Sequence, residues 1–166
     1  MTQRLITHLR HVDLAVPDFG KQLDFFTHTW GLTAEHSDSG LAFLAAEGSP
    51  EQYVVRLRQS EDKRIDLISF GAATPADVDT LAGQIAAEGV QLISEPGTLQ
   101  TPGGGYGFRF FDNEGRTVEI SSDVAVRQHR AIARLWCQAL IRMNHIMLPM
   151  RGCISVSDRA NARCFS

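Results

Sequence analysis

The chain has 166 residues, of which 43% are hydrophobic and 21% charged, and its formal net charge is -3. This composition supports a sizeable core and excludes global disorder, and the weak charge favours neither nucleic acid nor an anionic membrane as a partner. No apolar run approaches the roughly 18 residues of a membrane-spanning helix, and the N-terminus lacks the apolar stretch of a signal peptide. Three cysteines without metal-binding spacing predict a reducing, cytoplasmic location.

Charge is divided unevenly along the chain. Residues 1–126 hold nine Lys and Arg and eighteen Asp and Glu, a net charge of -9, whereas residues 127–166 hold seven Arg and one acid, a net charge of +6. All three cysteines and three of the four methionines also lie in the second stretch. The change predicts a folded acidic domain over 1–126, followed by a basic, Cys- and Met-rich tail over 127–166.

The first predicted elements are a strand, a helix and three further strands. Apolar residues alternate over 10–16, which is typical of a half-buried strand. The next segment places Leu23, Phe26 and Trp30 on one face of a helix. Short strands separated by turn-forming residues are then predicted at 32–36, 41–46 and 52–58.

The same order of elements repeats once. A strand is predicted at 65–70, and Thr74-Pro75 predicts an N-cap with proline at the first helical position. The helix ends at Gly89, and three strands follow at 90–94, 105–111 and 116–121. Two successive βαβββ units, at about 7–60 and 64–123, are therefore predicted.

Neither unit can bury both its helix and its sheet alone. The predicted fold is α+β, with the two βαβββ repeats forming one curved mixed sheet around a concave cup and the helices on the outer face. A concave face of this kind is where a small ligand would bind.

Two residues that can bind a metal are predicted to face the cup. On the first strand the apolar residues face the helix, so His11 and Asp13 point inward. On the last strand Val118 and Ile120 face the core, which turns Glu119 inward. A histidine and a carboxylate are the start of a facial triad for a divalent metal such as Fe(II), and a polar His–Glu pair without metal is the alternative.

The third ligand is missing from the pattern. Alignment of the two units puts Leu67, or Ile68 after a slip of one residue, where His11 stands, and neither can bind a metal. Asp66 is predicted to point to the face opposite Leu67. The metal site is therefore predicted to be incomplete. The glycine-rich segment 101–107 is predicted to lead into a strand, with Tyr106 and Arg109 at the rim of the pocket.

Two segments resemble a known superfamily. HLRHVDLAVPDFGKQLDFFTHTWGL resembles the opening unit, and TPGGGYGFRFFDNEGRTVEISSD the closing strands, of the vicinal oxygen chelate superfamily of glyoxalases, bleomycin-resistance proteins and extradiol dioxygenases. The resemblance is strongest to the N-terminal domain of two-domain extradiol dioxygenases. It implies Fe(II) and a catechol-like aromatic substrate held by a C-terminal domain, and an N-terminal domain without metal, a state that Leu67 fits.

The tail contains a further resemblance. IRMNHIML resembles the first strand of the second dioxygenase domain, where His145 would be the first metal ligand. The resemblance implies a dioxygenase interrupted early in its second domain and inactive on its own, and a natural C-terminal extension is the alternative. Two other functions remain open: a stand-alone glyoxalase-type metalloenzyme acting as a homodimer, and a metal-free protein that binds a small aromatic or drug molecule in its cup.

Overall fold

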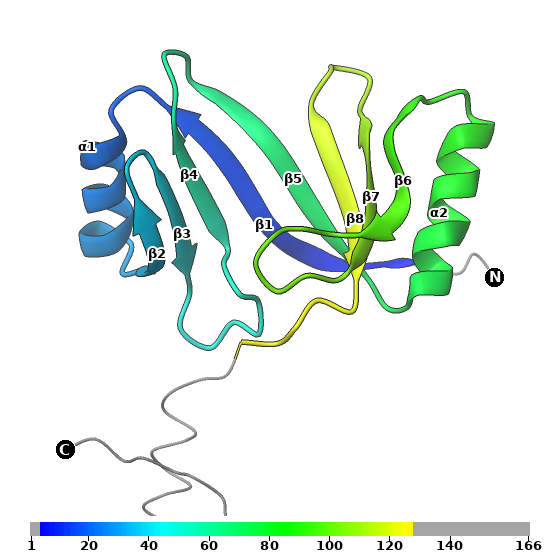
Figure 1. Cartoon of the computed structure of the whole chain (residues 1–166), viewed down its shortest axis with the longest axis horizontal. Helices are drawn as coiled ribbons and strands as arrows, with labels where there is room; N and C mark the ends of the chain where they lie inside the picture. The colour runs from blue at the N-terminus through cyan, green and yellow to red at the C-terminus, as the bar shows by residue number, and fades with distance from the viewer. Residues whose placement is uncertain (1–3, 128–166) are drawn as a thin grey trace, which may run out of the picture. The chain divides into compact units, whose positions relative to one another are not determined.

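The computed structural model describes residues 4–127, and the predictions for the tail, including His145, lie outside the described residues. The described part is one open, curved sheet with a helical segment at each end (Figure 1). Neither helical segment is long and apolar enough to cross a membrane. The elements are β1 (Ile6–Val16), α1 (Phe19–Asp24), the π-helical turn η1 (Phe25–Thr29), β2 (Thr33–Asp38), β3 (Leu41–Ala45), β4 (Val55–Gln59), β5 (Arg64–Ala72), α2 (Pro75–Ala87), β6 (Leu92–Thr98), β7 (Tyr106–Phe111) and β8 (Thr117–Ser122).

The sheet has an internally symmetric strand order. The order is β2-β3-β4-β1-β5-β8-β7-β6, in which β1 pairs with β4 and β5 pairs with β8, both in parallel. The two first strands, β1 and β5, pair antiparallel and join what we call the first half (β1 to β4) and the second half (β5 to β8). The predicted α+β fold of two βαβββ units in one curved mixed sheet is confirmed.

Each half has its own apolar core between its helix and its strands. In the first half, Phe26 packs with Leu44 and Leu57, and in the second half, Val78 packs with Phe108. Leu44, Leu57 and Phe108 alternate along their strands with residues that face the opposite side of the sheet. The helices therefore cover the convex face, and the concave face is left for polar side chains.

Helix α2 begins and ends as its sequence predicts. The Thr74 hydroxyl accepts a hydrogen bond from the Asp77 backbone N–H at 3.2 Å, and Pro75 occupies the first turn, where no N–H partner is needed. Gly89 follows the helix with φ +82°, a left-handed conformation that glycine adopts without a steric penalty.

The first helix departs from its prediction at Trp30. Phe26 is buried as expected, but Trp30 is 61% exposed. The cause is the π-helical turn η1, in which the Trp30 N–H donates to the Phe25 carbonyl at 3.2 Å. This wider i→i+5 turn moves Trp30 off the stripe that an ideal α-helix would form.

Candidate functional site

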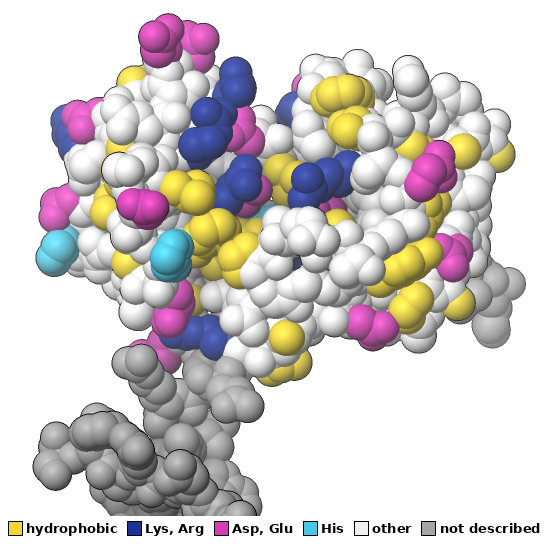
Figure 2. All heavy atoms as spheres, in the orientation of Figure 1, with side chains coloured by type: hydrophobic (Ala, Val, Ile, Leu, Met, Phe, Trp, Pro, Cys, Tyr) yellow, Lys and Arg dark blue, Asp and Glu magenta, His cyan; other side chains and the backbone are white. Residues whose placement is uncertain are grey.

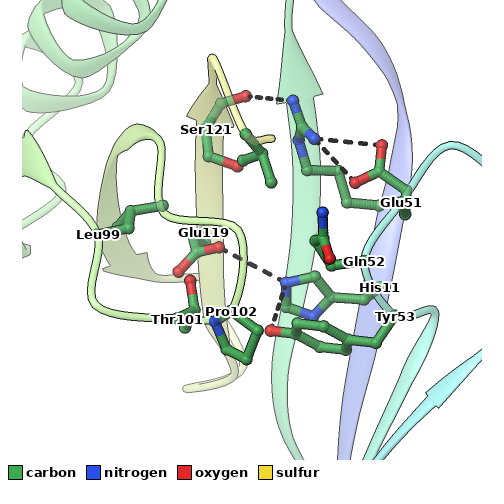
Figure 3. Close-up of a pocket in the computed structure, with 11 residues that line it drawn as sticks. His11, Glu51, Gln52, Tyr53, Leu99, Thr101, Pro102, Glu119 and Ser121 are labelled. Atoms are coloured by element: carbon green, nitrogen blue, oxygen red, sulfur yellow. Dashed lines mark hydrogen bonds and ion pairs between the residues drawn. The ribbon is translucent and has the colours of Figure 1, made fainter. Parts of the chain in front are cut away.

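The three central strands bring the candidate residues together on the concave face (Figure 3). His11 on β1 lies opposite Ser69 on β5, and Ser69 lies opposite Glu119 on β8. The imidazole Nε2 of His11 is 3.7 Å from Glu119 Oε1, and both side chains are buried. The structure thus brings together the two residues that the sequence placed in the cup.

The His11 ring is held by two further groups. Its Nδ1 lies 3.0 Å from Asp13 Oδ1, which accepts a hydrogen bond, and Asp13 Oδ2 forms an ion pair with Arg56 Nη2 at 2.9 Å. The Tyr53 hydroxyl lies 3.1 Å from His11 Nε2, and the two rings are 4.3 Å apart between centroids. Tyr53 and Arg56 were not identified from the sequence. Tyr53 lies in a loop and reaches His11 only in the folded protein, and Arg56 reaches Asp13 only through the pairing of β1 with β4.

Glu119 is fully engaged by neighbouring donors. Its Oε1 accepts a hydrogen bond from Ser69 Oγ at 3.0 Å, and its Oε2 accepts one from Arg109 Nε at 2.8 Å. The Arg109 Nη2 lies 2.7 Å from the same oxygen and completes the ion pair. The predicted cup residue Arg109 is therefore the counter-ion of Glu119. We call the chain Arg56–Asp13–His11–Glu119–Arg109 the cup network.

The charges in the cup network stabilise one another. Burial by itself lowers the pKa of His11, but hydrogen bonds and charges of Asp13 and Glu119 outweigh it, so this pKa is raised above its usual value. Burial by itself raises the pKa of Glu119, but His11 and Arg109 lower it below its usual value. Burial, followed by the nearby carboxylates, raises the pKa of Tyr53, which stays a neutral phenol.

The described residues do not fit a three-ligand metal centre. Leu67 faces the cup in the row of Ser69, pairs with Asp13, and offers no donor atom. Both oxygens of Glu119 already accept hydrogen bonds, one of them from a guanidinium. Within residues 4–127 no group of three or more His, Cys, Asp or Glu is placed to hold a metal ion. The cup network is instead satisfied internally, by hydrogen bonds and ion pairs among its own side chains.

The prediction for Asp66 is wrong because of a β-bulge. Asp13 pairs with Leu67 and the next residue of β1 pairs with Ile65, so Asp66 is an extra residue in β5. A bulge redirects the side chain at that position. The Asp66 carboxylate binds Arg58 Nε at 2.8 Å and Arg64 Nε at 2.8 Å. Arg58 lies two residues after Arg56 on β4, so Asp66 joins the concave face.

The prediction for Tyr106 is also wrong. Its hydroxyl donates to Asp79 Oδ1 on α2 at 2.8 Å, and its ring packs against the core of the second half. Tyr106 therefore lies on the convex face, on the opposite side of β7 from Arg109. The glycine-rich segment predicted that both residues lie at the pocket rim. Side chains alternate along β7, however, so only Arg109 faces the cup.

The segment from Leu99 to Gly105 folds over the cup network. Thr101 and Pro102 line a small space with His11 and Glu119, with a volume of about 10 Å³, enough for about one water molecule. Gly105 has φ +103°, and a Cβ atom there would lie 2.7 Å from the Ser122 carbonyl oxygen. Glycine is required where this loop meets β8, so the loop has a defined path.

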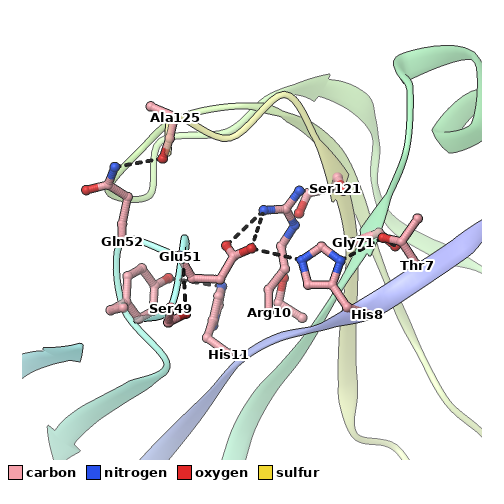
Figure 4. Close-up of polar contacts among 12 residues, drawn as sticks. Thr7, His8, Arg10, His11, Ser49, Glu51, Gln52, Gly71, Ser121 and Ala125 are labelled. Atoms are coloured by element: carbon pink, nitrogen blue, oxygen red, sulfur yellow. Dashed lines mark hydrogen bonds and ion pairs between the residues drawn. The ribbon is translucent and has the colours of Figure 1, made fainter. Parts of the chain in front are cut away.

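A second polar cluster fixes the loop that carries Tyr53 (Figure 4). Glu51 is largely buried, and its carboxylate accepts hydrogen bonds from Arg10 Nη1 at 2.9 and 3.2 Å and lies 2.8 Å from His8 Nε2. Gly71 provides the space for His8, since a Cβ there would lie 2.4 Å from the ring. These contacts hold the loop against β1 and so position Tyr53.

An apolar hollow lies beside the cup network on the concave face. Figure 2 shows Lys and Arg side chains around the centre of this face, beside a group of hydrophobic side chains. The hollow has a volume of about 130 Å³. It is lined by Glu35, His36, Phe43, Gln52, Tyr53, Pro102 and Arg127.

Comparisons with known proteins agree with this architecture. The glyoxalase/bleomycin resistance protein/dioxygenase superfamily matches residues 8–120. The chain is 34% identical over 121 residues to a protein named manganese-dependent 2,3-dihydroxybiphenyl 1,2-dioxygenase from Geobacillus genomosp. 3, covering 72% of this chain and 38% of that protein.

Two solved structures are also similar. The Mn(II)-bound glyoxalase from Novosphingobium aromaticivorans is 42% identical, with a TM-score of 0.73, over 76% of this chain and 42% of that one. Homoprotocatechuate 2,3-dioxygenase from Arthrobacter globiformis is 20% identical, with a TM-score of 0.67, over 74% of this chain and 38% of that one, and shares the fold. The chain thus spans about two fifths of the length of these relatives. It belongs to the glyoxalase/bleomycin resistance protein/dioxygenase superfamily.

Proposed function

We propose that residues 4–127 form the metal-free first module of an extradiol ring-cleaving dioxygenase-like protein. One observation carries the proposal: a complete eight-stranded cup in which both ligand-type residues, His11 and Glu119, are held by other protein groups. The burial patterns of β1 and β5 make Leu67 the equivalent of His11, and its side chain offers no donor atom, which supports a module without metal. In this proposal the module supplies a rigid scaffold, and ring cleavage takes place elsewhere in the protein.

The relatives support the class of chemistry. One is named as a manganese-dependent dioxygenase of a dihydroxylated biphenyl, and one is a Mn(II)-bound glyoxalase. The chain covers 38% and 42% of them, which leaves room in each for a second module of similar size. We therefore propose a catechol-type aromatic substrate and a divalent metal, Fe(II) or Mn(II), for the whole protein, with His145 as the first ligand of the second module.

The test is a ring-cleavage assay of the full 166-residue chain. The chain, incubated aerobically with 2,3-dihydroxybiphenyl and either Fe(II) or Mn(II), should form no coloured ring-cleavage product, while the Geobacillus relative provides the positive control. The metal content of the purified chain, measured by mass spectrometry, should be far below one ion per chain. Product formation that disappears in His11→Ala would show that the cup network is itself catalytic and would overturn the proposal.

A second function is favoured by one comparison. The 42% identity to a Mn(II)-bound glyoxalase favours a glyoxalase-type metalloenzyme. If the chain acts by itself, this function needs a homodimer in which two chains complete a metal site. This function requires stoichiometric Mn(II) and a dimeric mass in light scattering, both lost together when Glu119 is changed to Gln. A monomer without bound Mn(II) would exclude it.

A further inference from the structure

We propose that residues 123–127, which follow β8 and which we call the strap, act as a clasp that opens and closes the hollow on the concave face. In the closed state the strap joins the second half of the sheet to the loop of the first half that carries Tyr53. This conformational device goes beyond the scaffold role proposed above and depends neither on a metal nor on ring cleavage.

The strap crosses from one half of the sheet to the other. Figure 1 shows the chain leaving β8 and running toward the loop between β3 and β4. The N–H of Ala125 donates to the Gly103 carbonyl at 2.9 Å, and the Ala125 carbonyl accepts from Gln52 Nε2 at 2.7 Å (Figure 4). Gly103 lies in the loop before β7 and Gln52 in the loop before β4, so Ala125 bridges the two halves.

The end of the strap is anchored by Arg127. Its N–H donates to the Pro50 carbonyl at 2.8 Å, and its Nη1 donates to the Ala46 carbonyl at 3.2 Å. Its Nη2 forms an ion pair with Glu35 on β2. All three partners belong to the first half, although Arg127 follows the last strand of the second half. The strap is therefore a connection between the halves that is separate from the β1–β5 ladder.

An apolar contact ties the strap to the loop 99–105. Val124 lies against Gly103 and Gly105, where an added Cβ atom would lie 2.8 and 2.7 Å from the methyl carbons of Val124. The two glycines leave the space that this side chain fills. Because Val124 and Ala125 both contact the loop 99–105, we expect the loop and the strap to move together.

The hollow is lined largely by the strap and by groups that bind it. Arg127 belongs to the strap, and Glu35 and Gln52 bind it directly. Pro102 lies in the loop 99–105, and Tyr53 lies in the same loop as Gln52. Release of the strap would therefore free several walls of the hollow at once and widen it.

The strap begins with an unfavourable backbone conformation. Asp123 has φ +54° and is the one non-glycine residue within residues 4–127 with a positive φ. This left-handed region is unfavourable for a residue with a Cβ atom. Asp123 is exposed, so its side chain adds no packing that would offset the strain. A strained segment held by a few polar contacts at the surface is expected to open before the rest of the sheet.

The experiment is hydrogen–deuterium exchange of the full chain, read by mass spectrometry of its peptides. Arg127→Ala removes the ion pair with Glu35 and the bond to Ala46, so amides in the loop 46–54 should exchange about tenfold faster. The loop 99–105 should respond by a similar factor, although it has no listed bond to Arg127, because both loops are held by one clasp. Exchange in α2 should stay unchanged.

The matched control for this variant is Arg116→Ala. Arg116 also forms ion pairs, with Asp112 and Glu114, but it lies in the exposed turn between β7 and β8. Its loss should leave exchange in both loops unchanged.

A second pair of variants tests the clasp without removing any of its contacts, and decides the question if Arg127→Ala does not fold. Asp123→Val and Asp123→Gly remove the same exposed carboxylate. Valine is β-branched and disfavours a positive φ, so exchange in both loops should rise about fivefold. Glycine adopts this φ freely, so Asp123→Gly should exchange as the wild-type chain does or more slowly.

The inference is wrong if Arg127→Ala accelerates exchange in the loop 46–54 alone, because the two loops would then open independently. It is also wrong if α2 accelerates equally, since the strap would then open only with the whole domain, or if the two Asp123 variants behave alike. None of these measurements involves a metal or turnover, so each failure leaves the dioxygenase proposal untouched. Ring cleavage by the isolated chain would refute that proposal without affecting the exchange result.

Discussion

The two halves of the sheet share a topology but differ in chemistry at equivalent positions. The strands β1 and β5 end in the same pattern of buried and half-buried residues, which makes Leu67 the equivalent of His11 and Ser69 the equivalent of Asp13. The first half thus offers an imidazole and a carboxylate to the cup where the second half offers a methyl-bearing side chain and a hydroxyl.

The opposite faces of the same two strands do not differ in this way. Val12 and Leu14 on β1 correspond to Ile68 and Phe70 on β5, and all four are apolar and half-buried. The convex face is restricted because it must pack against a core, whereas the concave face can change its chemistry while the strand pairing is kept. The comparison teaches that fold and function are carried by opposite faces of the same strands.

The largest expected effect tests whether the two halves fold as one unit. Phe108→Ala in the second half and Leu57→Ala in the first should each lower the free energy of unfolding by about 3–5 kcal/mol, because each empties a fully buried position. Since β1 and β5 form one continuous ladder, urea denaturation followed by far-UV circular dichroism should show a single transition in both variants. Separate transitions for the two halves would contradict this.

A transplant of the second half's residues into the first tests the cup network. His11→Leu alone should lower the free energy of unfolding by about 1–3 kcal/mol, since the buried carboxylates of Asp13 and Glu119 each lose a partner. The double variant His11→Leu/Asp13→Ser reproduces the second half's pair of residues. It should be less destabilised than the sum of the two single variants, and strict additivity in urea denaturation would argue against a coupled network.

The helix caps provide a smaller contrast between the halves. Thr74→Ala should lower the free energy of unfolding by about 1 kcal/mol, because α2 loses the hydroxyl that accepts from the Asp77 N–H. Asp18→Ala should cost less, since α1 is only 6 residues long and buries none of its own residues. Thermal denaturation measures both. Thr80→Ala, in the middle of α2, is the control and should change stability less than Thr74→Ala does.

The smallest expected effect is a pH dependence that arises where His11 of the first half meets Glu119 of the second. The pKa of His11 is raised above 6.5 in the folded state, so its contribution to stability is fully present below that value and is lost as the pH rises through the folded pKa. The pKa of Glu119 is lowered from 4.5, so its contribution is present above that value and is lost as the pH falls through the folded pKa.

Both contributions are present together in the mildly acidic window between these two values. The stability difference between the wild-type chain and His11→Gln should therefore be greatest there and should shrink as the pH becomes alkaline. Urea denaturation at several pH values measures the difference, and an NMR titration of the His11 ring gives its pKa directly. A difference that grows toward alkaline pH would show that the ring is held in its neutral form.

Much of the architecture and half of the site were determined by the sequence itself. Alternation along a strand allows only two faces, so the apolar partners of His11 and Glu119 decided that both side chains point into the cup. The Thr74-Pro75 pair likewise determined where α2 begins, because capping depends on residues that are neighbours in the chain. Strand alternation and helix capping both depend on residues that are close in the chain, so the sequence pattern is sufficient to predict them.

The remainder was decided only by the tertiary structure. Tyr53 reaches His11 across 42 residues of sequence, and Arg109 reaches Glu119 through the register of β7 and β8. The bulge at Asp66 and the π-helical turn before Trp30 each shift a side chain away from the ideal periodicity on which sequence patterns depend. Strand register and irregular turns result from long-range packing, and that packing determined which charges in the cup neutralise each other.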